Sequence, residues 1–238
     1  MTAHNAPHLQ RAAPRLAVAV LVAALAGFAT LQALRGPPVA RASALPPPPP
    51  VAVLRVAALG DPIALGQLAT LYLQAFDHQP GISIPFRELD YARVTAWLEA
   101  ALALDPASHY PLLLAAQVYS QVPDTARQEA MLEFVARQFA ADPERRWRWL
   151  AHAAIVARHR LGNLPLALRY AGALQNVRSA PSWARQMHVL LLADMGEREA
   201  AQVLLGGLLA SGVVTDPRET RFLLERLETA DAPKNRHR

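Results

Sequence analysis

The sequence predicts an all-α protein in which a right-handed solenoid of about four antiparallel helix pairs and a final helix follows one membrane-spanning helix. Three observations predict this. The 238 residues are 53% hydrophobic but only 6% aromatic, and Leu and Ala dominate, a composition that favours helices over sheets. Prolines recur at similar intervals after residue 60, as repeated units would place them. Residues 16–34 hold no charged side chain.

The N-terminal apolar segment is long enough to cross a membrane. A helix rises 1.5 Å per residue, so about 20 residues span a hydrocarbon core of roughly 30 Å. We predict a tail over residues 1–15 and an anchor over residues 16–34. The alternative is a signal sequence cleaved near residues 40–42, "ARA", which would release the domain. The retained anchor is favoured because the apolar core of a signal sequence has about 7–15 residues.

The flanking charges bear on the orientation of this anchor. Arg11 and Arg15 precede it, and Arg35 and Arg41 follow it, so the positive-inside rule is almost balanced. We expect the short tail in the cytoplasm and the large domain outside. The composition is rich in Ala and Arg and poor in Lys, which indicates a GC-rich bacterial genome. The predicted location is therefore a bacterial inner membrane, with a periplasmic C-terminal domain.

A proline-rich linker is predicted over residues 35–58. Its centre is Pro46–Pro50, five consecutive prolines that impose polyproline II geometry. One interpretation is a semi-rigid spacer between membrane and domain, and the other is a ligand for a proline-binding module. The spacer is favoured because the segment joins the anchor directly to the domain.

Asp-Pro pairs recur along the rest of the chain. Proline disfavours helical geometry in the residue before it but suits the first position of a helix. An aspartate in front can accept a hydrogen bond from the free N–H groups of the new first turn. Each pair is thus expected to end one helix and begin the next. The positions are Asp61-Pro62, Asp105-Pro106, Asp142-Pro143 and Asp216-Pro217, with Ala180-Pro181 as a variant.

The intervals between these prolines each divide into two predicted helices. The prolines lie 44, 37, 38 and 36 residues apart, and such a period indicates stacked helix pairs. The repeat domain is expected over residues 59–228, before a disordered basic tail over 229–238. The predicted helices cover residues 62–76 and 86–104, 109–122 and 125–141, 144–161 and 164–177, 182–195 and 197–211, and finally 218–228.

The body resembles the tetratricopeptide repeat family over about residues 60–228. In "GNLPLA" and "GEREAA" a small residue, Ala167 or Ala201, follows the turn glycine by five positions, and Ala101 precedes Pro106 by five. The sequence departs from the family in its longer period and in lacking the Trp, Leu-Gly and Tyr of the first helix together. The resemblance implies binding of peptides or protein surfaces on the concave face lined by the first helices. It assigns no fixed binding residues.

A basic helix supplies the first group of candidate partner-binding residues. In "ERRWRWLAHAAIVARHR", residues 144–160, we expect Trp147, Leu150, Ala151 and Ala154 to face the core. The opposite side would meet an acidic peptide or lipid headgroups, or would be an ordinary solvated face. Two histidines without nearby carboxylates make a poor metal site, and no metal is predicted. The candidates on that side are Arg145, Arg148, His152 and His159.

The loop over residues 76–91 supplies the second group. It accounts for the long first interval, and Gly81 with two prolines interrupts helix there. Long loops between packed helices are often functional. The alternative is a loop that packs over and caps the open end of the stack. The candidates are Asp77, His78, Arg87 and Asp90.

Composition and motifs argue against several classes of protein function. Residues 1–50 carry four of the 24 basic side chains and no acid, which leaves 20 bases against 19 acids in the rest. That near balance argues against nucleic-acid binding. There is no cysteine, and the patterns of the common hydrolases, zinc proteases and nucleotide-binding enzymes are missing. We predict a non-enzymatic adaptor without cofactor that assembles an envelope complex. The alternatives are a regulatory or enzyme-like domain using loop 76–91 and a self-associating structural protein.

Overall fold

The structure, a computed structural model, describes residues 15–34 and 42–229. It divides into two compact units, residues 1–41 and residues 42–238. The first unit contributes one helix, α1 (Arg15–Leu34), whose window Ala17–Leu34 has a mean hydropathy of 2.1 and no buried residue. This confirms an N-terminal helix long and apolar enough to cross a membrane, a property that signal sequences share. The predicted tails over 1–14 and 230–238 and linker residues 35–41 lie outside the described residues.

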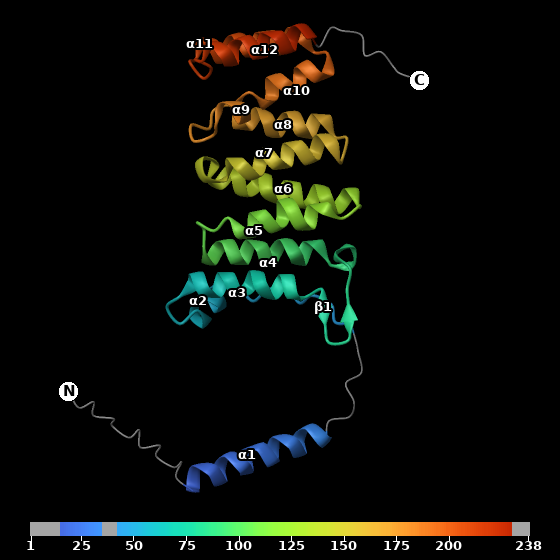
Figure 1. Cartoon of the computed structure of the whole chain (residues 1–238), viewed down its shortest axis with the longest axis vertical. Coiled ribbons are helices and arrows are strands. Elements are labelled where there is room, and N and C mark those ends of the chain that lie inside the picture. The colour runs from blue at the N-terminus through green and yellow to red at the C-terminus, as the bar shows by residue number, and fades with distance from the viewer. Residues whose placement is uncertain (1–14, 35–41, 230–238) are drawn as a thin grey trace, which may run out of the picture. The chain divides into compact units, whose positions relative to one another are not determined.

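The second unit is mostly helical over its described residues, and Figure 1 shows its helices layered in chain order. One two-stranded antiparallel hairpin pairs His78 with Ser83 and Gln79 with Ile82. The elements are α2 (Val51–Ala57), α3 (Pro62–Ala75), β1 (His78–Gln79), β2 (Ile82–Ser83), a 3-10 helix (Phe86–Glu88), α4 (Tyr91–Leu104), α5 (Tyr110–Leu113), a π-helical turn (Leu114–Val118), a 3-10 turn (Tyr119–Gln121), α6 (Thr125–Ala141), α7 (Pro143–His159), α8 (Leu164–Leu174), α9 (Ser182–Arg185), α10 (Met187–Met195), α11 (Arg198–Ala210) and α12 (Pro217–Thr229).

Neighbouring helices pack through small residues. Helix α3 packs on α4, α6 on α7, α7 on α8, and α10 on both α8 and α11. A Cβ added at Gly66 of α3 would lie 3.3 Å from the carbonyl oxygen of Ala101 in α4, so these two helices approach closely. Ala167 and Ala201 are fully buried in α8 and α11. One buried cluster runs from Leu45 to Leu191 and a second from Val189 to Leu227.

Side-chain caps start most of the long helices. Asp61 accepts from Ala64 N at 3.0 Å at the start of α3, and Asp124 accepts from Arg127 N at 2.9 Å at the start of α6. Asp142 ends α6 and also caps α7, with its Oδ1 atom 3.3 Å from Arg145 N. Asp216 accepts from Arg218 N at 2.7 Å, one residue into α12. The predicted helix starts at Pro62, Pro143 and Pro217 are confirmed.

Asp105-Pro106 is the exception. Its carboxylate accepts from Ala107 N at 3.2 Å, which closes a local turn instead of a helix. The next helix begins only at Tyr110, with Pro111 in its first turn. The expectation that this pair itself begins a helix is therefore wrong, although the helix predicted from residue 109 starts close by. Pro181 precedes α9 as its cap residue, and α9 starts at Ser182 as predicted.

Several predicted helices are shorter or interrupted. Within the helix predicted over residues 86–104, Phe86–Glu88 form a 3-10 turn and α4 begins only at Tyr91. Residues 109–122 pass from α5 through a π-helical turn, where the hydroxyl of Ser120 donates to Ala116 O at 2.6 Å. A side-chain donor that occupies a main-chain carbonyl competes with the regular helical ladder. Residues 182–195 divide into α9 and α10 at Gln186.

The described part of the linker, residues 42–58, does not stand free. Polyproline II carbonyls have no partner within their own segment, and here α4 supplies the donors. Trp97 Nε1 donates to Pro46 O at 2.8 Å, and the guanidinium of Arg93 donates to Leu45 O. Residues 51–57 then form α2, whose Leu54 packs on Ala100 and Leu104 of α4. The structure thus differs from the expected spacer from residue 42 onward.

The capping account predicts the effect of removing Asp142. We expect Asp142→Ala to lower the free energy of unfolding by about 1 kcal/mol, because the first turn of α7 loses its hydrogen-bond acceptor. Asp105→Ala is the control, since the Asp105 side chain accepts from Ala107 N in a turn and caps no helix N-terminus. Urea unfolding followed by circular dichroism measures both. Equal losses in the two variants would contradict the assignment of Asp142 as a helix cap.

Candidate functional site

Helix α7 has a polar, accessible side and a core side, as predicted. Arg145, Arg148 and His159 are exposed and His152 is half-buried. Leu150, Ala151 and Ala154 are buried, and Trp147 packs against the core while partly exposed. The four candidate residues follow one another at steps of three, four and seven, so the helix brings all four to the same side.

The two candidate arginines, Arg145 and Arg148, make different contacts with their neighbours. Arg145 Nε lies 3.0 Å from Asp142 Oδ2, an ion pair within the first turn of α7. The guanidinium carbon of Arg148 lies 5.7 Å from the centroid of the Trp147 ring. A cation–π contact engages the face of the guanidinium and leaves its N–H edge able to donate to a carboxylate. Arg148 is therefore the better placed of the two for an acidic partner.

His152 lies where α7 meets the preceding helix pair. Burial lowers its pKa, a hydrogen bond with the main chain of Ala116 opposes that shift, and the charge of Arg160 lowers the pKa further. Ala116 belongs to the π-helical turn Leu114–Val118, and such turns often occur at functional positions. The half-buried imidazole is more a contact between two helix pairs than a free ligand.

His159 lines a small cavity of about 100 Å³ between α7 and α10. Exposed Ile155 contributes an apolar wall, and Arg158 pairs with Asp194 at 2.8 Å. Arg226 of α12 reaches the other oxygen of Asp194 at 2.9 Å, so this carboxylate joins three helices. An apolar wall with convergent polar groups is typical of a binding cleft.

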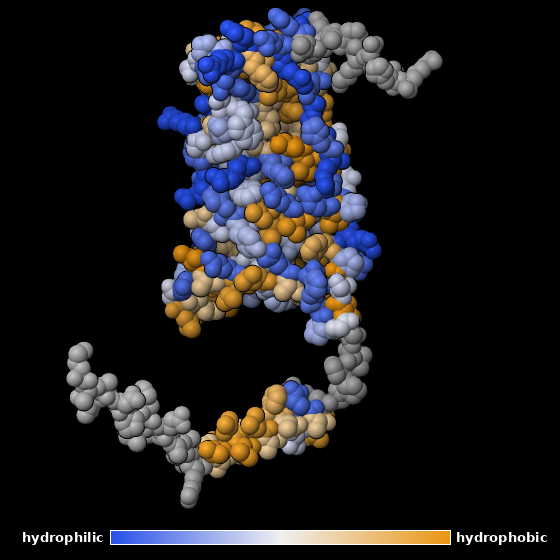
Figure 2. Space-filling view, viewed as in Figure 1, coloured by the Kyte–Doolittle hydropathy of each residue, from blue (hydrophilic) through white to orange (hydrophobic). Residues whose placement is uncertain are grey.

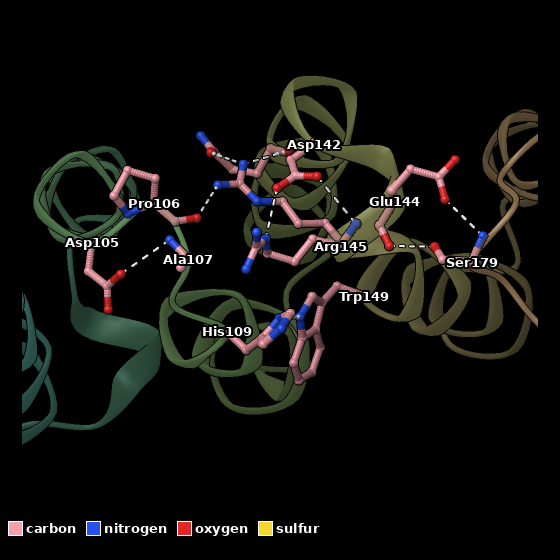
Figure 3. Close-up of polar contacts among 11 residues, drawn as sticks. Asp105, Pro106, Ala107, His109, Asp142, Glu144, Arg145, Trp149 and Ser179 are labelled. Atoms are coloured by element: carbon pink, nitrogen blue, oxygen red, sulfur yellow. Dashed lines mark hydrogen bonds and ion pairs between the residues drawn. The ribbon is translucent and has the colours of Figure 1, made fainter.

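Sequence reasoning missed His109, which sits beside the basic end of α7 (Figure 3). Its Nδ1 accepts a hydrogen bond from Trp149 Nε1 at 3.2 Å. Burial lowers the pKa of His109, and the charges of Arg148, Arg145 and Arg146 lower it further. The imidazole is therefore held neutral, because protonating it would add a cation among three arginines and remove the acceptor.

Arg146 belongs to the basic segment 144–160 but is only 5% exposed. Its Nη1 donates to the main-chain oxygen of Gln138 at 2.7 Å, and its Nη2 donates to Pro106 O at 3.0 Å. Arg146 thus ties α7 to the end of the preceding pair rather than binding a partner.

Contacts between helix pairs recur at nearly constant sequence separation. Glu144, for example, accepts from the main-chain N–H of Ser179 at 2.8 Å, and the same carboxylate binds Arg178 N, contacts that lower the pKa of Glu144. The two residues of each pair below are 33 to 40 positions apart in sequence, which is close to the spacing of the prolines. The proline spacing is the sequence signal that could have located these contacts. The pairs are Ser43–Gln79, Gln74–Tyr110, Glu99–Arg137, Pro106–Arg146, His109–Trp149, Glu129–Asn163, Glu133–Arg169, Glu144–Ser179, Arg158–Asp194 and Gln186–Glu219.

The second candidate group is spread along the loop over residues 76–91. Asp77 Oδ1 lies 2.9 Å from Nδ1 of the exposed His78 at the start of the hairpin. Asp90 caps α4, accepting from Ala92 N at 3.0 Å, and pairs with Arg93. Arg87 is exposed on the 3-10 turn. The structure therefore pairs Asp77 with His78 but commits the Asp90 carboxylate to its own helix.

The same loop is held to the body on both sides. Ile84, Phe86 and Leu89 pack into the core, and the Phe86 ring lies 5.5 Å from that of Tyr119, edge to face. On the outer side, Gln79 Oε1 accepts from Ser43 N and Gln79 Nε2 donates to Ser43 O, at 2.8 and 2.9 Å. These contacts are those of a packed connection between α3 and α4.

Within residues 15–34 and 42–229, no three His, Asp or Glu side chains are grouped as a metal ion would require. Searches against protein-family models, curated proteins and solved structures return no match to this chain. The function is therefore inferred from the geometry described above.

The neutral histidines predict a pH-dependent stability. Burial lowers the pKa of His109, His152 and His188 in the folded protein. Below the ordinary histidine pKa of about 6.5 the unfolded chain then binds more protons than the folded one, so stability falls as pH falls. We expect the urea midpoint to drop between about pH 7.5 and pH 5.5, with a shallower drop in His109→Gln. An identical drop in the variant and the wild type would show that His109 does not contribute.

Proposed function

We propose that this protein is a membrane-anchored adaptor whose tetratricopeptide-like, right-handed solenoid binds another protein during assembly of a bacterial envelope complex. The observation that carries the proposal is the set of contacts 33 to 40 residues apart. Most of them join one helix pair to the next at the interval of the prolines, which is what a solenoid requires, and Ser43–Gln79 and Gln186–Glu219 join a pair to the segment before or after it. The apolar α1 supports a membrane anchor. We propose the inner membrane and a periplasmic helical body because the N-terminal tail is short and the composition is bacterial in character.

The accessible side of α7 is the proposed partner-binding surface. It combines Arg148, whose N–H edge can donate, with Ile155 and the cleft rimmed by His159. Helix α7 is the first helix of its pair, and first helices line the concave face in the family that the sequence resembles. An extended or helical segment of a partner that carries an acidic residue beside an apolar one fits these groups.

A binding rather than a catalytic role is part of the proposal. The carboxylates of Asp90, Asp142 and Asp194 are engaged in caps and ion pairs that hold helices together. The hairpin loop is packed between the core and Ser43, which favours a structural part for residues 76–91 over the enzyme-like alternative.

Site-specific photo-crosslinking tests the proposed surface. A photoreactive amino acid at Ile155 is expected to crosslink the full-length protein to one partner in native membranes. The same amino acid at Val203, an exposed residue on α11, is the control. Crosslinking at Val203 as strong as at Ile155 would contradict the assignment of the binding surface to α7.

A charge reversal tests the expected partner chemistry. Arg148→Glu should reduce the yield at Ile155 about ten-fold, because a charge-assisted hydrogen bond contributes about 1.5–3 kcal/mol. Arg137→Glu makes the same charge change on α6, at an exposed arginine paired with Glu99. A similar loss in both variants would indicate a general charge effect and contradict a specific role for Arg148.

A further inference from the structure

The outer side of the first two helices of the body exposes an apolar surface. Figure 2 shows hydrophobic residues gathered at the end of the body formed by α2 and α3. We call this surface the N-terminal apolar face. It comprises Val53, Val56, Leu59, Leu68 and Leu71, each of which has more than half of its side chain exposed. Surfaces of this kind mark contacts with a protein or a membrane.

Folding alone does not account for this face. Leu59 is 94% exposed and adopts a left-handed backbone with φ of +49°, a conformation that suits glycine or asparagine better than leucine. Residues 42–76 hold only two charged side chains, Arg55 and Asp61. Asp61 is engaged in capping α3, and Arg55 Nη2 donates to Ala103 O at 3.4 Å. The face therefore carries large aliphatic side chains, and the exposed Asp61 between α2 and α3 is the one acidic residue of this stretch.

The opposite end of the same unit is built differently. Stacked repeat domains need terminal helices with a polar outer face to stay soluble. Helix α12 meets this need, since its sequence "PRETRFLLERLET" buries Leu223 and Leu227 and alternates exposed apolar residues with charged ones. In the part of the chain that the structure describes, α2 and α3 at the other end hold a single charged residue, Arg55, and so lack such a polar cover.

The length of the intervening chain indicates what covers the face. Leu34 ends α1, and Ala42 is followed at once by Ser43, which is hydrogen-bonded to Gln79 of the hairpin. Eight residue steps of at most about 3.6 Å hold Ala42 within about 29 Å of the end of α1. That distance is less than the thickness of one bilayer. With α1 anchored, the tether therefore keeps the start of the body within reach of the bilayer surface.

We propose that the N-terminal apolar face lies in the membrane–water interface, so that α2 and α3 dock the helical body directly onto the bilayer. The inference rests on the proposed function in that α1 must be in the membrane. Aliphatic side chains from the face enter the boundary between headgroups and acyl chains, as the apolar side of an interfacial helix does. The exposed Arg55 on α2 favours anionic lipids.

Lipid-quenching of a fluorophore tests the docking. The chain has no cysteine, so a single cysteine can be placed and labelled in the full-length protein. Val56 and Val203 are a matched pair, because both are helical valines with 78% of the residue exposed. The labelled proteins are reconstituted in vesicles of phosphatidylethanolamine and phosphatidylglycerol that contain brominated phosphatidylcholine. We expect the label at Val56 to be quenched several-fold more than the label at Val203.

A second variant separates docking from folding. Leu59→Asn places a residue that tolerates a left-handed backbone at an exposed position, so the thermal midpoint should be unchanged or slightly raised. Quenching at Val56 should nevertheless fall in this variant. A variant that is less stable and shows unaltered quenching would mean that Leu59 serves the fold, and would overturn its part in the docking.

The outcomes distinguish this inference from the proposed function. Carbonate extraction of the same vesicles reports whether α1 holds the chain in the membrane. Retained protein with equal quenching at Val56 and Val203 overturns the docking and leaves the anchor intact. Extracted protein without quenching at Val56 overturns both. A label at Val56 that escapes lipid quenching but becomes shielded as protein density rises assigns the face to a second copy, and also overturns the docking.

Discussion

A helix pair in residues 62–229 cannot bury its apolar residues alone, and the rest of the structure depends on the next pair covering them. Ala101, Phe134 and Leu150 come from three different helices and belong to the same buried cluster. The helices themselves are short and rich in Ala and Leu, so packing rather than intrinsic propensity decides their stability. Polar contacts such as Arg146 to Pro106 O then fix the register of one pair on the next.

This dependence explains where the sequence was informative. Capping depends on only a few adjacent residues. The sequence therefore predicted correctly the helix starts that follow Asp61, Asp142 and Asp216. Apolar periodicity likewise predicted the core side of α7. The helical composition and the N-terminal apolar helix followed from residue types alone.

The errors arose where tertiary contacts override local signals. Asp105 has the same neighbour as Asp142, but its carboxylate closes a turn with Ala107 and α5 starts later. We predicted that the prolines before α2 form a spacer, because the sequence does not show that Trp97 donates a hydrogen bond to Pro46 O. Arg146 and His109 escaped notice for a similar reason, since their environments come from residues eight to forty positions away. Loop 76–91 provided one Asp–His pair rather than a converged site.

The proposed adaptor has two surfaces of different chemistry. The side of α7 combines arginine, histidine and isoleucine and suits a polypeptide, whereas the end formed by α2 and α3 is aliphatic and suits a bilayer. Docking that end would fix the direction in which the α7 surface points. A partner would then meet the binding surface at a defined height above the membrane, which is useful for ordering the parts of an envelope complex.

Chemical crosslinking between paired cysteines tests most directly whether the helix pairs stack in chain order. The chain has no cysteine, so pairs of cysteines can be introduced. Two double-cysteine variants substitute side chains that are in contact, Glu99 and Arg137 in one and Glu133 and Arg169 in the other. A third variant substitutes Glu99 and Arg169, which lie two units apart in sequence. A short bis-maleimide should join the first two pairs efficiently and leave the third unjoined. Efficient joining of Glu99 to Arg169 positions, or failure of both contact pairs, would contradict the stacked arrangement.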